Sequence, residues 1–158
     1  MIEEKKVHDH GFVRLLEVMG DDEEVVNAAR ISYGKGTKKF SETRNLIRYL
    51  MRHKHTSPFE MCEVKFHLKL PIFVMRQLVR HRTANINEYS GRYSEMSDDF
   101  YIPEDDYIQK QSKTNNQGRG DESEQKGLVK FEMNRSADGA YYAYQHMLNH
   151  DIARELAR

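Results

Sequence analysis

The chain has 158 residues, the length of one ordinary domain, and its 25 basic and 25 acidic side chains leave no formal net charge. This balance argues against nucleic-acid or membrane binding through bulk electrostatics, and no segment is apolar for long enough to span a membrane. The first ten residues lack the apolar stretch of a signal peptide, and the single cysteine excludes an internal disulfide and a cysteine-rich metal site. We therefore expect a cytoplasmic protein that holds no metal and that has neither nucleic acid nor membrane as a partner.

Two helices are predicted in the first third of the chain. The first begins after Asp21, which together with Glu24 forms a variant of the capping box, and it ends at Gly34 with Ser32 in its last turn. Ser41 is the predicted N-cap of the second helix, which ends near Lys54. The apolar positions are Val25, Ala28 and Ala29 in the first helix and Leu46, Ile47, Leu50 and Met51 in the second.

A short loop, HTSPFE, and a strand are predicted next. The loop begins at His55 and contains Ser57, although His55 equally suits the carboxyl end of the preceding helix, where a histidine interacts favourably with the helix dipole. From Glu63 to Leu70 apolar and polar residues alternate. This pattern predicts a half-buried strand with Val64 and Phe66 on its inner face.

A helix and then a polar segment are predicted after the strand. Pro71 fits the first turn of this helix, whose core face holds Ile72, Met75 and Val79. Residues 103–125 are polar and nearly without apolar anchors, so we predict that they form a mobile surface loop.

A long helix is predicted after the polar segment, and it ends at Asn149. The final segment, IARELAR, is predicted as a further helix with Asp151 as its cap. The helical spacing of Tyr141, Tyr142 and Tyr144 favours packing in the core and between subunits over a ring-stacking platform. The residues expected to face the core are Leu128, Phe131, Tyr141, Tyr144 and Leu148.

The segment RHRTANINEYSGRY, residues 80–93, has the composition of a site for phosphate and a planar ring. Arginine offers a planar, permanently charged fork that suits phosphate, and the other polar side chains can read the edges of a ring. Two alternatives remain open: the arginines could pair with surface carboxylates, or they could bind RNA with tyrosines as stacking groups. The residues concerned are Arg80, Arg82 and Arg92; His81, Asn87, Glu88 and Ser90; Asp98, Asp99 and Glu104; and Tyr89 and Tyr93.

The same segment resembles the signature of the flavin-dependent thymidylate synthases, the ThyX family, which is RHR followed by seven residues and a serine. The likeness extends to ARISYG, HTSPFE, PIFVMRQLVRHR, SEMSDDFYIP and ARELAR. The resemblance implies an α+β fold with a central, mainly antiparallel sheet and packed helices, assembled as a homotetramer with active sites between subunits. It also implies an enzyme that methylates dUMP to dTMP using FAD, with methylenetetrahydrofolate and NADPH as co-substrates.

The resemblance assigns binding roles to residues of this chain that stand at the matching positions of the family motif. The family has leucine where this chain has Tyr89, but the main chain of Tyr89 could make the same contact with dUMP. Flavin binding is implied for Ser57, Arg80, His81, Arg82 and Glu88, and also for His55 and Ser32. Binding of dUMP is implied for Gln77, Leu78, Val79, Arg80, Glu88, Tyr89, Ser90, Gly91, Arg92 and Arg158.

Ser90 and Arg80 are the predicted catalytic residues. Because no neighbouring residue in the sequence is a dedicated base for Ser90, we expect this serine to position and polarise the substrate rather than attack it. Cys62 shares the parity of the apolar face of the predicted strand, so we expect a structural thiol in the core and not a nucleophile.

The family resemblance also implies that a complete member continues beyond ARELAR. The further segment bears an arginine that helps to ionise the uracil, together with more flavin contacts. We therefore expect this single domain to be C-terminally incomplete, as a truncated, split or degenerate product, and to bind dUMP and FAD more weakly than a complete enzyme. A separate C-terminal polypeptide would then complete the site, and the alternative function is a catalytically incomplete fragment.

Overall fold

The computed structural model describes residues 3–32 and 43–158, which divide into two compact units. Among the described residues, one unit comprises 3–5, 13–32 and 43–68, and the other comprises 6–12 and 69–158. The single domain that the sequence predicts stays a prediction. Within the described ranges, no helix is both long enough and apolar enough to cross a membrane.

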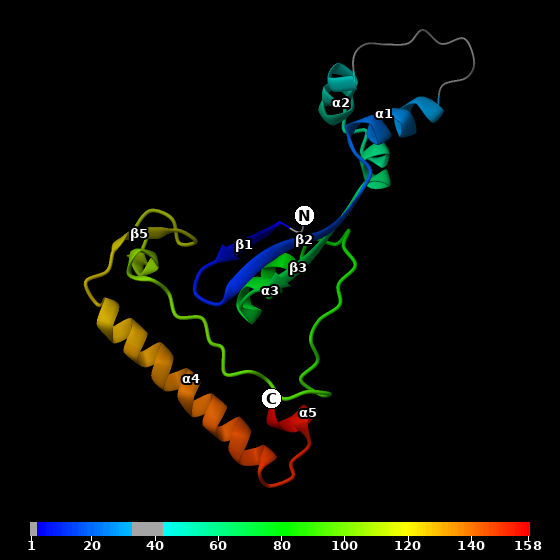
Figure 1. Ribbon diagram of the computed structural model, residues 1–158. Coiled ribbons are helices and arrows are strands. Elements are labelled where there is room, and N and C mark those ends of the chain that lie inside the picture. Colours follow the sequence, from blue (N-terminus) through cyan, green and yellow to red (C-terminus); the bar gives the residue numbers. More distant parts are fainter. Residues whose placement is uncertain (1–2, 33–42) are drawn as a thin grey trace. The chain divides into compact units, whose positions relative to one another are not determined.

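A three-stranded sheet has the order β1 (Glu4–Val7), β2 (Gly11–Met19) and β3 (Glu63–Lys69), as Figure 1 shows. With the helices, this antiparallel sheet confirms the predicted α+β class. The sequence does not predict β1 and β2. In β2 the apolar residues come in adjacent pairs, Phe12 with Val13 and Leu15 with Leu16, and this pairing hides the period of two that marks a strand.

β3 confirms the predicted strand to within one residue, but its burial was predicted wrongly. Val64 and Phe66, expected to face the core, are 52% and 51% exposed. The described residues therefore leave this apolar face largely uncovered. Alternation correctly indicated the backbone conformation, and it could not indicate whether the same chain supplies the covering surface.

The first unit contains a small helical core. α1 (Asp22–Ile31) contacts both α2 (Thr43–Arg52) and a 3₁₀ helix, η1 (Ser57–Met61), which lies where a loop was predicted. Asp21 is confirmed as the N-cap, because its Oδ1 accepts hydrogen bonds from the backbone N–H groups of Glu23 and Glu24 at 2.8 and 3.1 Å. The predicted Gly34 stop and Ser41 cap lie outside the described residues. Val25, Ala29 and Leu50 form the buried cluster, against which Leu46, Ile47, Phe59 and Cys62 pack.

Two details of this core differ from prediction. Met51 is exposed, whereas Val26, which was not predicted as a core residue, is fully buried. Cys62 lies half-buried at the edge of the cluster, where its Sγ is 3.6 Å from the carbonyl oxygen of Asp21. Gly20 precedes the helix with a φ of 83°, and a Cβ at this position would lie 2.7 Å from Cys62 Sγ.

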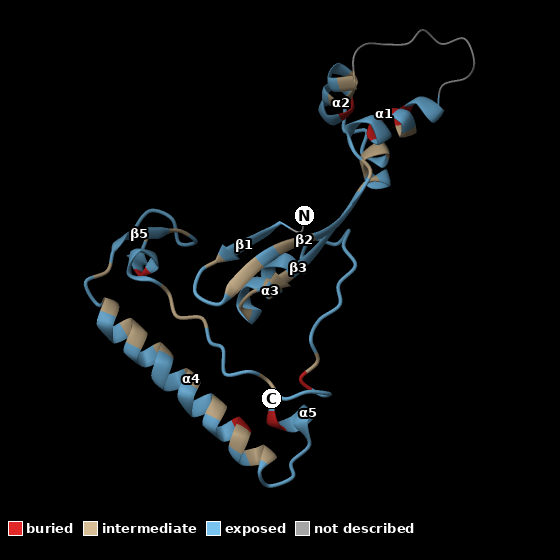
Figure 2. Ribbon diagram, in the orientation of Figure 1, coloured by how far each residue is buried: buried red, intermediate tan, exposed pale blue. Residues whose placement is uncertain are grey.

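The second unit begins its helical part with α3 (Ile72–Leu78), whose N-cap is Pro71. Proline thus stands one position before the predicted first turn. The predicted core face is wrong at Ile72 and Val79, which are exposed, and only Met75 is partly buried. Figure 2 shows the exposure of this helix.

The polar range 103–125 contains regular structure that the sequence does not predict. A 3₁₀ turn, η2 (Asp105–Tyr107), precedes a hairpin of β4 (Gln109–Gln111) and β5 (Arg119–Glu122). These strands pair antiparallel with an irregular register, and the buried Ile108 lies just before β4. Polar strands without alternation give no strand signal, so composition alone suggested a loop. The mobility of this range stays a prediction.

The last two helices are α4 (Lys126–Leu148) and α5 (Arg154–Ala157), which contact each other. The predicted end of the long helix is confirmed, with Asn149 as its C-cap. Asp151 was wrongly predicted as the cap of α5, because it has a φ of 58° and Ala153 is the N-cap. Tyr144 is buried, and Tyr141 and Leu148 are partly buried, whereas Leu128 and Phe131 are 56% and 61% exposed, which contradicts their predicted core positions.

Candidate functional site

The carboxyl end of α3 holds the first predicted site residues. The backbone N–H of Arg80 donates to the carbonyl of Gln77 at 3.1 Å, and that of His81 donates to the carbonyl of Leu78 at 3.0 Å. These bonds add a turn to the helix end, after which the chain continues without a regular element to η2. Gln77, Leu78, Arg80 and His81 are therefore held close together by local backbone structure.

The side chains of Arg80 and Arg82 are exposed and form no ion pair or hydrogen bond with another described residue. The alternative of an ion-pair network with Asp98, Asp99 and Glu104 is not formed among the described residues. Asp99 instead accepts a hydrogen bond from Lys69 Nζ at 2.6 Å. The two guanidinium groups thus keep their donors available for an anion.

Ser90 begins a tight turn near the carboxyl end of the motif. The Ser90 carbonyl accepts hydrogen bonds from the N–H groups of Tyr93 and Ser94 at 3.2 and 3.3 Å, and Ser90 Oγ accepts one from the N–H of Arg92 at 3.3 Å. Ser90 is half-buried, and no described side chain that could act as a base is hydrogen-bonded to its hydroxyl. An unactivated hydroxyl is a poor nucleophile at neutral pH, so this geometry suits the positioning role that remains a prediction for Ser90.

Gly91 brings the C-terminal residue Arg158 to this turn. Gly91 is buried, and a Cβ placed on it would lie 2.8 Å from Met96 Sδ and 3.3 Å from Arg158 Cδ. Only glycine allows such a close approach without displacing these neighbours. The structure therefore places Arg158 beside the turn that contains Ser90, two residues that the sequence assigns to one binding site.

Two ion pairs join the segment that follows Ser90 to α5. Arg92 Nη2 lies 3.3 Å from Glu155 Oε2, and Arg154 Nη2 lies 3.7 Å from Glu95 Oε1. Both pairs are exposed, and exposed ion pairs contribute little to stability. Glu95, Arg154 and Glu155 were not predicted as neighbours of the site.

The tyrosines of α4 also reach this segment, although sequence reasoning left them out of the site. The N–H of Met96 donates to Tyr144 Oη at 3.0 Å, and Tyr141 Oη donates to the carbonyl of Met96 at 3.4 Å. Gln145 Nε2 in turn donates to Tyr141 Oη at 3.1 Å. The sequence could have indicated such a contact, because a tyrosine that packs into a core generally needs a hydrogen-bond partner for its hydroxyl. Tyr89, expected to contact dUMP, donates its hydroxyl proton to the Glu95 carbonyl at 2.7 Å.

Three predicted flavin residues belong to the other compact unit. Ser32 is the C-cap of α1, and Ser57 begins η1. His55 follows the end of α2, where its N–H donates to the carbonyl of Leu50 at 2.9 Å. The centroid of the His55 ring lies 6.2 Å from that of the Tyr49 ring, so His55 neighbours an aromatic side chain of α2. Glu88 is exposed in the unit that contains Ser90, and its side chain contacts no described partner.

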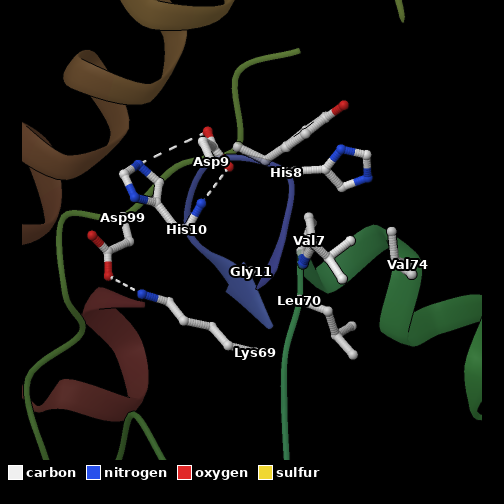
Figure 3. Close-up of a pocket in the computed structure, with 11 residues that line it drawn as sticks. Val7, His8, Asp9, His10, Gly11, Lys69, Leu70, Val74 and Asp99 are labelled. Carbon is white, nitrogen blue, oxygen red and sulfur yellow. Dashed lines mark hydrogen bonds and ion pairs between the residues drawn. The ribbon is translucent and has the colours of Figure 1, made fainter. Parts of the chain in front are cut away.

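A separate cavity of about 150 Å³ lies between the β1–β2 turn, the start of α3 and the segment around Asp99 (Figure 3). Val7, Leu70 and Val74 give it an apolar lining, and the Lys69–Asp99 ion pair lies at its rim. The hydrogen bond from Lys69 holds the pKa of Asp99 below its ordinary value. None of the residues lining this cavity was predicted to bind dUMP or flavin.

Two neighbouring groups in this cavity have shifted pKa values. Burial raises the pKa of Tyr101. Burial also tends to raise the pKa of Asp9, but hydrogen bonds from the N–H groups of His10 and Ile102 outweigh it, and the pKa of Asp9 is lowered. Across residues 3–32 and 43–158, no three His, Cys, Asp or Glu side chains form a group suited to a metal ion.

A family model and several curated proteins match this chain, and all of them carry thymidylate synthase in their names. The family model described as "Thymidylate synthase complementing protein" matches residues 14–158. The flavin-dependent thymidylate synthase of Ehrlichia ruminantium (strain Gardel) is 56% identical over 160 residues, which cover 100% of this chain and 54% of that protein. The protein of the same name from Wolbachia pipientis wMel is 52% identical, with 100% and 56% covered. The chain thus spans about half the length of the curated relatives it matches.

Solved structures resemble the chain as well. The UMP/dUMP methylase PolB from Streptomyces cacaoi, bound with 5-Br UMP, matches with a TM-score of 0.83 and 38% identity. This match covers 96% of the present chain and 65% of PolB. The same methylase bound with 5-Br dUMP gives a TM-score of 0.83 and 35% identity, with 96% and 68% covered.

Proposed function

Because the chain belongs to the family of flavin-dependent thymidylate synthases, we propose that it forms the nucleotide-binding part of an enzyme that methylates dUMP to dTMP. The observation that carries this proposal is the Ser90 turn, in which the buried Gly91 lies against Arg158. An arginine beside a serine-containing turn offers the donors that a nucleotide monophosphate needs. The relatives' names and the nucleotides bound to PolB support the same substrate class.

We assign the phosphate of dUMP to the arginines and the uracil to the uncharged polar groups. Arg158 and Arg92 lie at the Ser90 turn, and Arg80 keeps its guanidinium donors free of described partners. Ser90 Oγ already accepts the Arg92 N–H, so its own proton remains available to donate to a uracil oxygen. In this proposal Ser90 and Arg80 polarise and hold the substrate. The remaining proposed contacts are Gln77, Leu78, Val79, Glu88, Tyr89 and Gly91.

We further propose that the chain binds flavin as FAD. The side chains of Arg80, His81 and Arg82 are exposed and unengaged among the described residues, which fits a phosphate-bearing cofactor. Glu88 would be shared between the flavin and dUMP, and Ser32, His55 and Ser57 of the other compact unit stay predicted flavin contacts. When bound, the flavin supplies the reducing equivalents, with NADPH as their source and methylenetetrahydrofolate as the carbon donor. The protein's residues bind and orient these molecules.

We propose a homotetramer with active sites between subunits as the working assembly, in the cytoplasm. Exposed apolar side chains support this proposal: Phe66 on β3, Phe73 on α3 and Phe131 on α4 are each more than half exposed. Apolar surface of this extent favours burial against another protein surface. A separate C-terminal polypeptide is an alternative source of that surface.

The assay that tests the function measures dUMP-dependent oxidation of reduced flavin and formation of dTMP by the full chain. It is run with and without a candidate C-terminal polypeptide from a relative. We expect the lone chain to bind dUMP and FAD weakly and to form dTMP only when completed. Turnover by the lone chain would refute the expected incompleteness, whereas tight RNA binding without flavin would refute the enzyme.

A further inference from the structure

We propose that Tyr144 is a positioning residue for the dUMP site, acting through Met96 on the turn that contains Ser90 and Gly91. This inference rests on the proposed function, since it names a residue that sets the geometry of that site. Tyr144 lies on α4, far from the motif in the sequence, and no predicted site residue is on that helix. Its hydroxyl is nevertheless joined directly to the backbone of the segment that follows the turn.

The first contact is a hydrogen bond from a partly buried amide. Tyr144 is 6% exposed, and its Oη accepts the N–H of Met96 at 3.0 Å. Tyr141 donates to the carbonyl of the same residue at 3.4 Å, and Gln145 donates to the Tyr141 hydroxyl. Both backbone polar groups of Met96 are therefore bound by side chains of one helix. This arrangement fixes the position of Met96 relative to α4.

The second contact is between the Met96 side chain and Gly91, and it links the position of Met96 to that of the turn. Met96 Sδ lies 2.8 Å and its Cγ 3.4 Å from the place that a Cβ on Gly91 would occupy. Arg158 Cδ lies 3.3 Å from the same point. The Met96 side chain and the Arg158 stem therefore pack on one side of Gly91. A shift of Met96 would move the backbone between Ser90 and Arg92, or the Arg158 guanidinium, or both.

Removing the Tyr144 hydroxyl should loosen this arrangement without emptying the core. Phenylalanine keeps the ring that packs in the buried position, but it leaves the Met96 N–H without its acceptor. A partly buried donor without a partner is unfavourable, so the backbone around Met96 would move to find one. Tyr142 is the matched control on the same helix, because it is 71% exposed and its hydroxyl has no hydrogen bond with a described residue.

The experiment compares Tyr144→Phe, Tyr141→Phe and Tyr142→Phe with the unmodified full chain. Titration calorimetry gives the dissociation constants for dUMP and FAD, and hydrogen exchange without ligand gives the protection of residues 90–96. We expect Tyr144→Phe to weaken dUMP binding about fivefold to tenfold, the loss of one hydrogen bond of ordinary strength. Exchange at residues 90–96 should rise, FAD binding should stay within about twofold, and Tyr142→Phe should change neither.

A double-mutant cycle with Met96→Ala tests the route. If Tyr144 acts through the Met96 side chain, Tyr144→Phe should have little further effect on dUMP affinity once Met96 has been shortened. A fully additive effect, or equal dUMP affinities of Tyr144→Phe and Tyr142→Phe, would overturn the positioning role alone. Absence of dUMP binding by the unmodified chain would overturn the proposed function, and this role with it. A parallel loss of dUMP and FAD affinity would indicate general unfolding and would also contradict the inference.

Discussion

At the scale of single residues, the contact of the buried Gly91 with Arg158 brings together two segments whose dUMP-binding role is a prediction from the family resemblance. Met96, Tyr141 and Tyr144 were missed because hydrophobic spacing reports that a residue packs, and it does not report which backbone group its hydroxyl meets.

Gly20 gives a residue-scale prediction about stability. Its φ of 83° is unfavourable for residues with a Cβ, and that atom would lie 2.7 Å from Cys62 Sγ. We expect Gly20→Ala to lower the free energy of unfolding by about 1–3 kcal/mol, as measured by denaturant titration. Gly139→Ala is the control, because a methyl group there meets open space within α4 and should be neutral or stabilising. An unchanged stability of Gly20→Ala would show that the backbone can relax at this position.

At the scale of elements, regular patterns predicted structure and irregular ones did not. α1 and β3 were predicted because the N-cap of the first and the alternation of the second are clear. β4 and β5 were missed because QKQ and RGDE contain no apolar residue, and their pairing depends on backbone hydrogen bonds. Helices and strands could therefore be predicted from the sequence wherever their apolar side chains recur with a regular period.

The ion pair between Lys69 and Asp99 gives a prediction at this scale, because it ties the end of β3 to the segment before η2. The hydrogen bond from Lys69 lowers the pKa of Asp99 in the folded chain, so the ionised carboxylate stabilises the fold. That stabilisation is present above the ordinary pKa of aspartate, about 3.9, and is lost as the pH falls through the lowered value. Denaturation curves from pH 7 to pH 3 measure it.

Asp99→Asn should therefore be less stable than the unmodified chain at pH 7, and the difference should shrink towards pH 3. Asp98→Asn is the matched control, since the neighbouring carboxylate forms no ion pair with a described residue. A difference between Asp99→Asn and the unmodified chain that stays constant with pH would assign the effect to packing and not to charge.

At the scale of the whole molecule, the described chain buries few apolar side chains and exposes many. Leu128 and Phe131, predicted to face the core, lie on exposed parts of α4, and Val64 and Phe66 do the same on β3. The sequence indicated that these four residues form apolar faces of their elements. It could not indicate whether the covering surface belongs to the same chain, because hydrophobic periodicity is identical in a core and in an interface.

Phe131→Glu tests the proposed assembly. A charge in a buried interface is unfavourable, so this variant should reduce the mass of the assembly, measured by light scattering on a size-exclusion column. The stability of the separated chain should change little, because Phe131 is 61% exposed within it. Asp138→Lys, a charge change at an exposed position of the same helix, should leave the mass unaltered. An unchanged mass of Phe131→Glu would remove this face of α4 from the interface.

The central claim is that the Ser90 turn and Arg158 form a site for dUMP, and calorimetric titration of dUMP into the full chain tests it most directly. The unmodified chain and Arg135→Gln, an exposed arginine of α4 paired with Glu132, should bind at one site per chain with equal affinity. Arg158→Gln should bind about tenfold to one-hundredfold more weakly, the loss expected for a charge-assisted hydrogen bond. Equal affinity of Arg158→Gln and the unmodified chain, or no binding by the unmodified chain, would contradict the claim.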